Sequence, residues 1–248
     1  MIELGVTLDE VAVLRESRKS RTPDPVFCGF LAEQAGATAV NVQLRGDRRY
    51  VQERDVHLLR DALGVELNLV LAPTQEMIHF ALTAKPDRIT FVPERLETAG
   101  GGGLDVILNA PQLRERVREI REGTMFPVIF IDPSIEQVKA AHQVGALGVE
   151  LSATAFTAAS DSMGLARDRE AVEHELQKLR DSARLAAKLE LHVSIRHGIT
   201  LRNVRHLLDV PGLGRINVGH DLVARAVTVG FESAVRTWAE VLWKAPEN

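Results

Sequence analysis

Residues 128–151 read VIFIDPSIEQVKAAHQVGALGVEL. The stretch opens with a short apolar run, Val128–Ile131, which is typical of a buried β-strand. An amphipathic segment follows, Ser134–Val144, with a hydroxyl residue at its start and Gly145 just past its end, which are the usual signals of a helix. A second apolar run, Gly148–Leu151, comes next. A strand, a helix and a strand in this order predict two parallel strands joined by a crossover helix.

The same alternation extends over the whole chain. Further strands are expected at Leu4–Leu8, Ala39–Leu44, Val65–Leu71, Arg88–Val92, Leu189–Ile195 and Arg215–Val218. Further helices are expected at Pro23–Ala35, Val51–Leu63, Thr74–Thr83, Asn109–Glu122, Asp168–Lys188, Leu201–Leu208 and Phe231–Trp243. Eight strand–helix units in 248 residues, without a linker or a change in composition, predict one closed (β/α)8 TIM barrel over residues 1–248, with extra short helices.

The composition excludes several classes of partner. With 30 Lys and Arg against 34 Asp and Glu, the net charge is −4, which argues against a nucleic-acid partner. No apolar run reaches the roughly 20 residues of a membrane span, and the N-terminus lacks the basic region of an export signal. Cys28 is the sole cysteine, so an internal disulfide is excluded and a cytoplasmic location is expected.

One segment, Pro93–Leu108, breaks the alternation. It contains Gly100–Gly103, and consecutive glycines do not favour a regular element. Because the segment follows a strand, it belongs to the catalytic face of the barrel. It is expected to be either a plain surface loop or a lid that closes over the site.

A barrel of this kind builds its active site from the carboxyl ends of the strands and the loops that follow. That rule selects residues at and after the strand ends, Arg196 and Asn217 among them. The predicted site residues are Asp9, Glu10, Arg18, Arg45, Tyr50, Glu150, His197, Gly198, Gly219 and His220. His197 directly follows a strand and precedes a glycine, which favours a functional over a structural histidine. Glu150 lies within an apolar strand, where a carboxylate needs partners or a raised pKa, so it is a second catalytic candidate.

The eighth unit favours a phosphate site. Gly219 is followed by a short helix-like stretch, Asp221–Val229, before the closing helix. TIM barrels frequently bind phosphate with the loops after strands seven and eight and the N-terminus of such a helix, although a plain turn would also fit. The partner is therefore expected to be inorganic phosphate or a small phosphorylated substrate. No residues have the spacing of a metal site, so neither a metal nor a cofactor is expected.

Several strings, distributed over nearly the whole chain, resemble the pyridoxine 5'-phosphate synthase family. They include Thr22-Pro23-Asp24-Pro25, Ala32-Glu33-Gln34-Ala35-Gly36-Ala37, Leu44-Arg45 with Asp47-Arg48-Arg49, Val92-Pro93-Glu94, Phe130-Ile131-Asp132, His197-Gly198 and Asn217-Val218-Gly219-His220. The resemblance implies a metal-free condensation of 1-deoxy-D-xylulose 5-phosphate with 3-amino-2-oxopropyl phosphate in vitamin B6 biosynthesis. It also implies a homo-oligomer, an octamer with extra helical segments at its interfaces.

The resemblance assigns roles to individual residues. Arg18 and Arg45 match arginines that act on phosphorylated substrates, and Asp9 and Tyr50 match substrate-contacting positions. His197 matches a proton donor, with Gly198 as a backbone contact. Gly219 and His220 match a phosphate contact, and Glu150 matches a glutamate that assists the transition state.

Two general bases of the family have no counterpart here. The motif Val-His-Leu-Arg-Glu-Asp is Val42-Gln43-Leu44-Arg45-Gly46-Asp47, and Asn-Leu-Glu is Asn68-Leu69-Val70. Gln43 does not titrate and Val70 can neither take a proton nor form a hydrogen bond. Since a positioned base is worth about 10²–10⁴-fold in rate, slow turnover of the parent reaction is expected. Glu10, which stands where the family has histidine, is a candidate replacement base.

Three functions remain open at this point. The first is a divergent synthase that uses Glu150, His197 and Glu10 for proton transfer. The second keeps the barrel and the phosphate site but catalyses another reaction of the lyase or isomerase type. The third is a non-catalytic paralogue that binds phosphorylated metabolites. The fold does not distinguish them, because this barrel hosts many chemistries.

Overall fold

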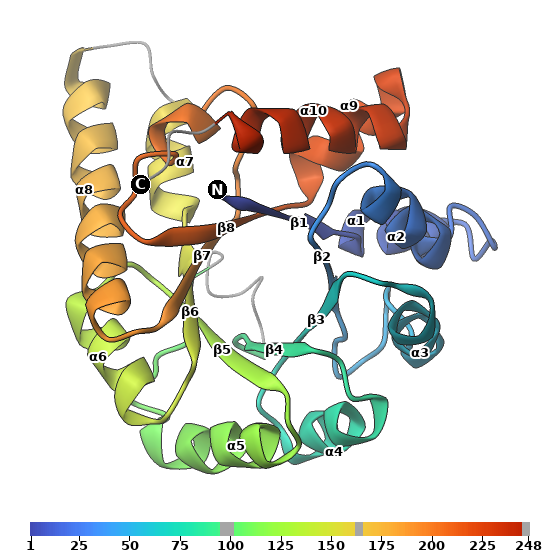
Figure 1. Ribbon diagram of the computed structural model, residues 1–248, viewed down its shortest axis with the longest axis horizontal. Helices are drawn as coiled ribbons and strands as arrows, with labels where there is room; N and C mark the ends of the chain where they lie inside the picture. The colour runs from blue at the N-terminus through green and yellow to red at the C-terminus, as the bar shows by residue number, and fades with distance from the viewer. Residues whose placement is uncertain (95–101, 162–165, 245–248) are drawn as a thin grey trace.

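The computed structural model describes residues 1–94, 102–161 and 166–244. Eight parallel strands form a closed barrel in the order β1 to β8, and the helices lie around its outside (Figure 1). The strands are β1 Glu3–Thr7, β2 Ala39–Gln43, β3 Glu66–Leu71, β4 Arg88–Phe91, β5 Phe126–Ile131, β6 Gly148–Ser152, β7 His192–Arg196 and β8 Leu213–Val218. The TIM-barrel prediction is confirmed, and the closure pairs β1 with β8, for example Gly5 with Asn217.

The helices follow the strands, with several short additions. They are α1 Asp9–Ser17, α2 Pro25–Gln34, α3 Glu53–Ala62, α4 Gln75–Ala84, α5 Ala110–Glu122, α6 Ile135–Gln143, α7 Thr154–Asp161, α8 Ala166–Lys188, α9 His220–Val229 and α10 Phe231–Trp243. The sequence pattern did not indicate α1 or α7. Helix α9 confirms the predicted extra helix after the eighth strand. In the described part of the chain, no helix has the length and apolar character needed to cross a membrane.

One predicted helix, Leu201–Leu208, is wrong. Between β7 and β8, where every residue is described, the chain forms turns and one 3-10 helix, η1, Val204–His206. The reason is the side chain of Asn203, which accepts the backbone N–H of Thr200 at 2.8 Å and donates to the carbonyl of Gly198 at 3.1 Å. An asparagine that satisfies nearby backbone groups in this way competes with the hydrogen bonds of an α-helix.

Because side chains alternate between the two faces of a strand, buried apolar residues in the described part of the chain form two separate clusters, one between the barrel and the helices and one inside the barrel. On β3, the side chains of Leu67, Leu69 and Leu71 join the main core between barrel and helices. Val70 instead belongs to a small separate apolar cluster with Val92 and Phe130. Alternate strand residues point to opposite faces, so this second cluster lies inside the barrel, on the same side as Glu66 and Asn68.

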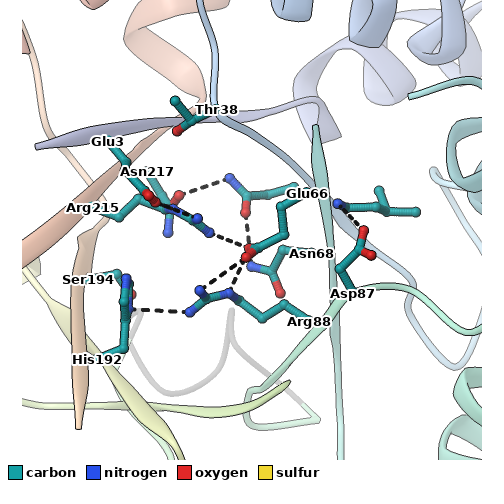
Figure 2. Close-up of polar contacts among 12 residues, drawn as sticks. Glu3, Thr38, Glu66, Asn68, Asp87, Arg88, His192, Ser194, Arg215 and Asn217 are labelled. Carbon is teal, nitrogen blue, oxygen red and sulfur yellow. Dashed lines mark hydrogen bonds and ion pairs between the residues drawn. The ribbon is translucent and has the colours of Figure 1, made fainter. Parts of the chain in front are cut away.

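A charged network fills the N-terminal end of the barrel interior (Figure 2). Glu66 accepts from Arg88 Nε at 2.7 Å and also from Arg215, which in turn donates to Glu3 at 2.6 Å. Burial alone would raise the pKa of Glu66, but the hydrogen bonds from Arg215 and Arg88 outweigh it and lower the pKa. His192 lies 3.3 Å from Arg88, and burial lowers its pKa to about 4. The network closes the end of the barrel opposite to the carboxyl ends of the strands, where stability rather than catalysis is expected.

Replacing Glu66 by Ala is expected to lower the free energy of unfolding by about 3 kcal/mol, because two largely buried guanidinium groups lose their shared partner. Urea unfolding followed by circular dichroism measures this loss. The matched control is Glu53→Ala, which removes a partly exposed ion pair with Arg48 and should cost only about 0–1 kcal/mol. Equal losses of unfolding free energy in the two variants would show that the buried network contributes no more to stability than the partly exposed ion pair.

Candidate active site

A cavity of about 750 Å³ opens at the carboxyl ends of the strands. Of the ten predicted site residues, the structure brings eight together in its wall: Asp9, Glu10, Arg45, Tyr50, His197, Gly198, Gly219 and His220. These residues come from the segments that follow β1, β2, β7 and β8. The barrel therefore brings together residues that lie far apart in the sequence, at the end where TIM-barrel active sites are found.

The other two predicted residues lie elsewhere. Arg18 is the exposed C-cap of α1 and does not line the cavity. Glu150 is almost fully buried, with 1% of its surface exposed, and lies inside the barrel rather than in the cavity wall. The lid hypothesis concerns a segment of which residues 95–101 lie outside the described part of the chain.

The end of β7 presents His197 on a constrained backbone. His197 has φ of +76° and Gly198 has φ of +67°, so two consecutive residues adopt the left-handed region. This region is uncommon for a histidine, and strain of this kind tends to occur at functional sites. A side chain on Gly198 would also place its Cβ 2.3 Å from Thr157 Oγ1. The imidazole of His197 packs edge-on against Phe130, with ring centroids 4.9 Å apart, so its direction is fixed.

The turn from β8 into α9 places a helix N-terminus at the cavity wall. Gly219 is the N-cap of α9, a helix of ten residues, and His220 begins the helix beside the cavity. The first N–H groups of a helix have no partner within it, and the helix dipole favours a negative charge at that end. A Cβ at residue 219 would lie 3.0 Å from Glu10 Oε2, so the Glu10 side chain would have to move to accommodate it. Gly219 lines the cavity without a side chain of its own.

A chain of hydrogen bonds crosses the barrel interior below the cavity. Thr90 donates to Asn68 at 3.0 Å, Asn68 to Asn41 at 2.9 Å, and Asn41 to Asn217 at 3.0 Å. Asn217 then donates to Glu150 Oε1. Since buried polar groups need partners, this chain fixes the side chains that support the cavity from beneath.

Both oxygens of Glu150 are engaged. Oε1 accepts from Asn217, and Oε2 accepts from Arg196 Nη1 at 3.3 Å. Arg196 lines the cavity and lies over the ring of Phe130, with its guanidinium carbon 5.6 Å from the ring centroid. In this arrangement Arg196, rather than Glu150, faces the cavity.

Arg196 stands at a strand end that the sequence rule selects, but it was given no role in the site, although a signal existed. It ends β7, and His192, Ser194 and Arg196 alternate toward one face of that strand. His192 contacts the charged network inside the barrel, so Arg196 must point inward as well. Asn217, at the end of β8, also lines the cavity and was likewise given no role, because its inward direction follows from strand register rather than from residue type.

Asp9 is a carboxyl group of the cavity wall whose pKa is shifted. Its Oδ1 accepts the backbone N–H of Gln43 at 2.7 Å. Burial raises the pKa of Asp9 to about 6, although the bond from Gln43 and the charges of Arg196 and Arg45 act in the opposite direction. A carboxyl group with such a pKa can change protonation near neutral pH.

Gln43 and Val70, at whose positions the family resemblance implies general bases, are direct neighbours. Gln43 on β2 is paired in register with Val70 on β3. Gln43 lines the cavity, whereas Val70 is fully buried with Val92 and Phe130. This corner of the site therefore offers an amide and an apolar surface. Within residues 1–94, 102–161 and 166–244, no group of His, Cys, Asp and Glu side chains is arranged to hold a metal ion.

Solved structures with this fold include enzymes that are distant in sequence. KGPDC from Streptococcus mutans matches with a TM-score of 0.64 at 11% identity, covering 98% of this chain and 99% of that one. Thiamine phosphate pyrophosphorylase from Pyrococcus furiosus matches with a TM-score of 0.61 at 16% identity, covering 99% of this chain and 98% of that one. At these identities the likeness concerns the fold alone.

Sequence relatives are much more similar. Pyridoxine 5'-phosphate synthase of Geotalea daltonii is 40% identical over 98% of this chain and 99% of its own length. The protein of the same name from Trichodesmium erythraeum is 44% identical over 95% of this chain and 96% of its own length. The family model of the pyridoxal phosphate biosynthesis protein PdxJ matches residues 4–244. The chain belongs to the PdxJ family of pyridoxal phosphate biosynthesis proteins, as the resemblance in its motifs predicted.

Proposed function

We propose that the protein closes the ring of pyridoxine 5'-phosphate by condensing 1-deoxy-D-xylulose 5-phosphate with 3-amino-2-oxopropyl phosphate. The observation that carries the proposal is the gathering of eight predicted site residues in one cavity of a chain similar to synthases over 98% of its length. The cavity volume, about 750 Å³, is in the range of small-molecule sites.

The cavity supports a division of roles. The N–H groups at Gly219 and His220 bind a substrate phosphate at the start of α9, and Arg45 adds a positive charge to the same cavity. His197 gives and takes protons on the reacting carbonyl or imine. Glu10 supplies a carboxylate next to Gly219, and Glu150 acts through Asn217 and Arg196, which it holds in place. Arg18 is left without a role in this cavity.

The replaced bases predict a slow enzyme. Gln43 and Val70 occupy positions where the family pattern has a histidine and a glutamate. The loss of one positioned base lowers a rate by about 10²–10⁴-fold, and losses within one site are not additive. Turnover is therefore expected to lie well below that of relatives with both bases.

Restoring the bases tests this proposal. Gln43→His, alone and combined with Val70→Glu, is expected to raise the rate of ring closure by about 100-fold, since a histidine at residue 43 lines the cavity. The rate is measured as pyridoxine 5'-phosphate formed from both substrates. The single variant matters because Val70→Glu buries a charge among Val92 and Phe130 and can unfold the barrel. Folded variants that bind 1-deoxy-D-xylulose 5-phosphate without any gain in rate would contradict the proposal.

A second function is favoured by the apolar corner itself. A buried cluster of Val70, Val92 and Phe130 suits a site that no longer takes a proton there. The alternative is a lyase- or isomerase-type reaction on another phosphorylated substrate, or binding without turnover. Tight binding of phosphorylated sugars with no ring closure in the wild type or the Gln43→His variant would favour it.

A further inference from the structure

Two carboxyl groups follow β1 directly and line the cavity. Asp9 and Glu10 form the first turn of α1, and acidic residues are common there because they complement the helix dipole. That role alone does not explain their contacts. Glu10 Oε2 is buried against Gly219 and has no hydrogen-bond partner among the described residues, and Asp9 reaches across to β2.

Asp9 lies beside the position of a missing base. One carboxyl oxygen, Oδ1, is held by the backbone N–H of Gln43, the residue that stands where the family pattern has a histidine. The hydrogen bonds among the described residues leave the second oxygen, Oδ2, without a partner. Asp9 therefore places a fixed carboxyl group at the same corner of the cavity, and this group, unlike the Gln43 amide, can accept a proton.

Burial and the neighbouring charges together set the pKa of Asp9. Burial raises its pKa to about 6, and the charge of Glu10 acts in the same direction. Arg196 from β7 and Arg45 from the loop after β2 lower it. The other titratable groups in the cavity wall are His197, Tyr50, His220 and Asp221. A general base is most effective when its pKa lies near the working pH.

We propose that Asp9 is the general base of this site and takes over the proton transfer that residues 43 and 70 no longer perform. The inference rests on the proposed function, since it assumes a phosphorylated keto substrate in the cavity. In the step, the carboxylate of Asp9 takes a proton from a carbon next to the keto group of 1-deoxy-D-xylulose 5-phosphate. The C–H bond breaks, an O–H bond forms on Asp9, and the electron pair moves to the carbonyl oxygen as an enolate. Arg196 lies close enough to interact with Asp9 and offers a positive charge for that oxygen.

Hydrogen–deuterium exchange on the substrate measures this proton transfer without requiring ring closure. Wild-type protein is incubated in D2O with 1-deoxy-D-xylulose 5-phosphate alone, and deuterium on the carbons next to the keto group is measured by NMR. Exchange is expected in the wild type, with a rate that falls as the pH drops below about 6, because the base becomes protonated. Asp9→Asn is expected to lower the rate by about 100-fold or more, while Asp9→Glu restores part of it. The amide oxygen of Asn still accepts the Gln43 N–H, so binding by calorimetry should persist.

A control variant and the possible outcomes make the test decisive. Glu16→Gln also replaces a carboxylate of α1, but its partner is Arg15 and it lies outside the cavity wall, so exchange should be unchanged. Wild-type exchange that survives in Asp9→Asn overturns the inference, as does a wild type that binds the sugar phosphate without exchange. Exchange that depends on Asp9 in a protein without ring closure refutes the proposed function but supports Asp9 as the base. Absence of binding refutes both.

Discussion

His197→Asn is expected to lower the rate of ring closure by about 10²–10⁴-fold while leaving the protein folded. The imidazole is held at the cavity, at the end of β7, by its packing on Phe130. Asn is chosen because it tolerates the left-handed backbone at this residue, where φ is +76°, better than most residues do. The rate constant and KM are measured separately from initial rates. The loss should fall on kcat, because the variant leaves the proposed phosphate contacts at Gly219 intact.

The control for this variant is another histidine. His206 belongs to η1 and packs on Phe156, with ring centroids 6.3 Å apart, outside the cavity wall. His206→Asn should therefore keep the wild-type rate. A wild-type kcat in His197→Asn would show that His197 does not transfer a proton.

Gly5→Ala is expected to disrupt the site from beneath and to lower the free energy of unfolding by about 3 kcal/mol. Gly5 lies on β1 inside the barrel, where a Cβ would come within 1.8 Å of Asn217 Oδ1 and 2.8 Å of Asn41 Nδ2. Both atoms take part in the hydrogen-bond chain that reaches Glu150, so the methyl group has to displace Asn217. Urea unfolding gives the stability, and ring closure should be lost even in the folded fraction.

Gly46→Ala provides the comparison for stability. Among the described residues, apart from the two chain neighbours of Gly46, no atom lies within 4 Å of a Cβ at this position, so the free energy of unfolding should stay within about 0.5 kcal/mol of the wild type. If Gly5→Ala were equally stable and active, the interior chain from Asn41 to Glu150 would not support the site.

The barrel could be predicted because apolar periodicity is a local signal. The runs Val128–Ile131 and Gly148–Leu151 fall within β5 and β6, and Gly145 closes the connection between them. Leu201–Leu208 has a similar pattern, yet Asn203 diverts the backbone hydrogen bonds there. Local competition by one side chain is difficult to weigh from periodicity alone.

The site could be predicted only in part, because alternation along a strand shows which residues share a face but not which residues of other strands they contact. Sequence position correctly placed His197 and Gly219 at the cavity, but it also selected Arg18, which ends α1 at the surface. Glu150 was correctly singled out as a buried carboxylate, yet its partners Asn217 and Arg196 come from β8 and β7. Such partners depend on how strands distant in the sequence are paired around the barrel.

The most direct test of the central claim is ring closure by the purified wild-type protein. Both substrates, 1-deoxy-D-xylulose 5-phosphate and 3-amino-2-oxopropyl phosphate, are supplied, and pyridoxine 5'-phosphate is measured by mass spectrometry against a control without protein. The account predicts product above the control at a low rate, with turnover carried by His197 and the carboxyl groups after β1. Absence of product from protein that still binds the sugar phosphate would contradict it.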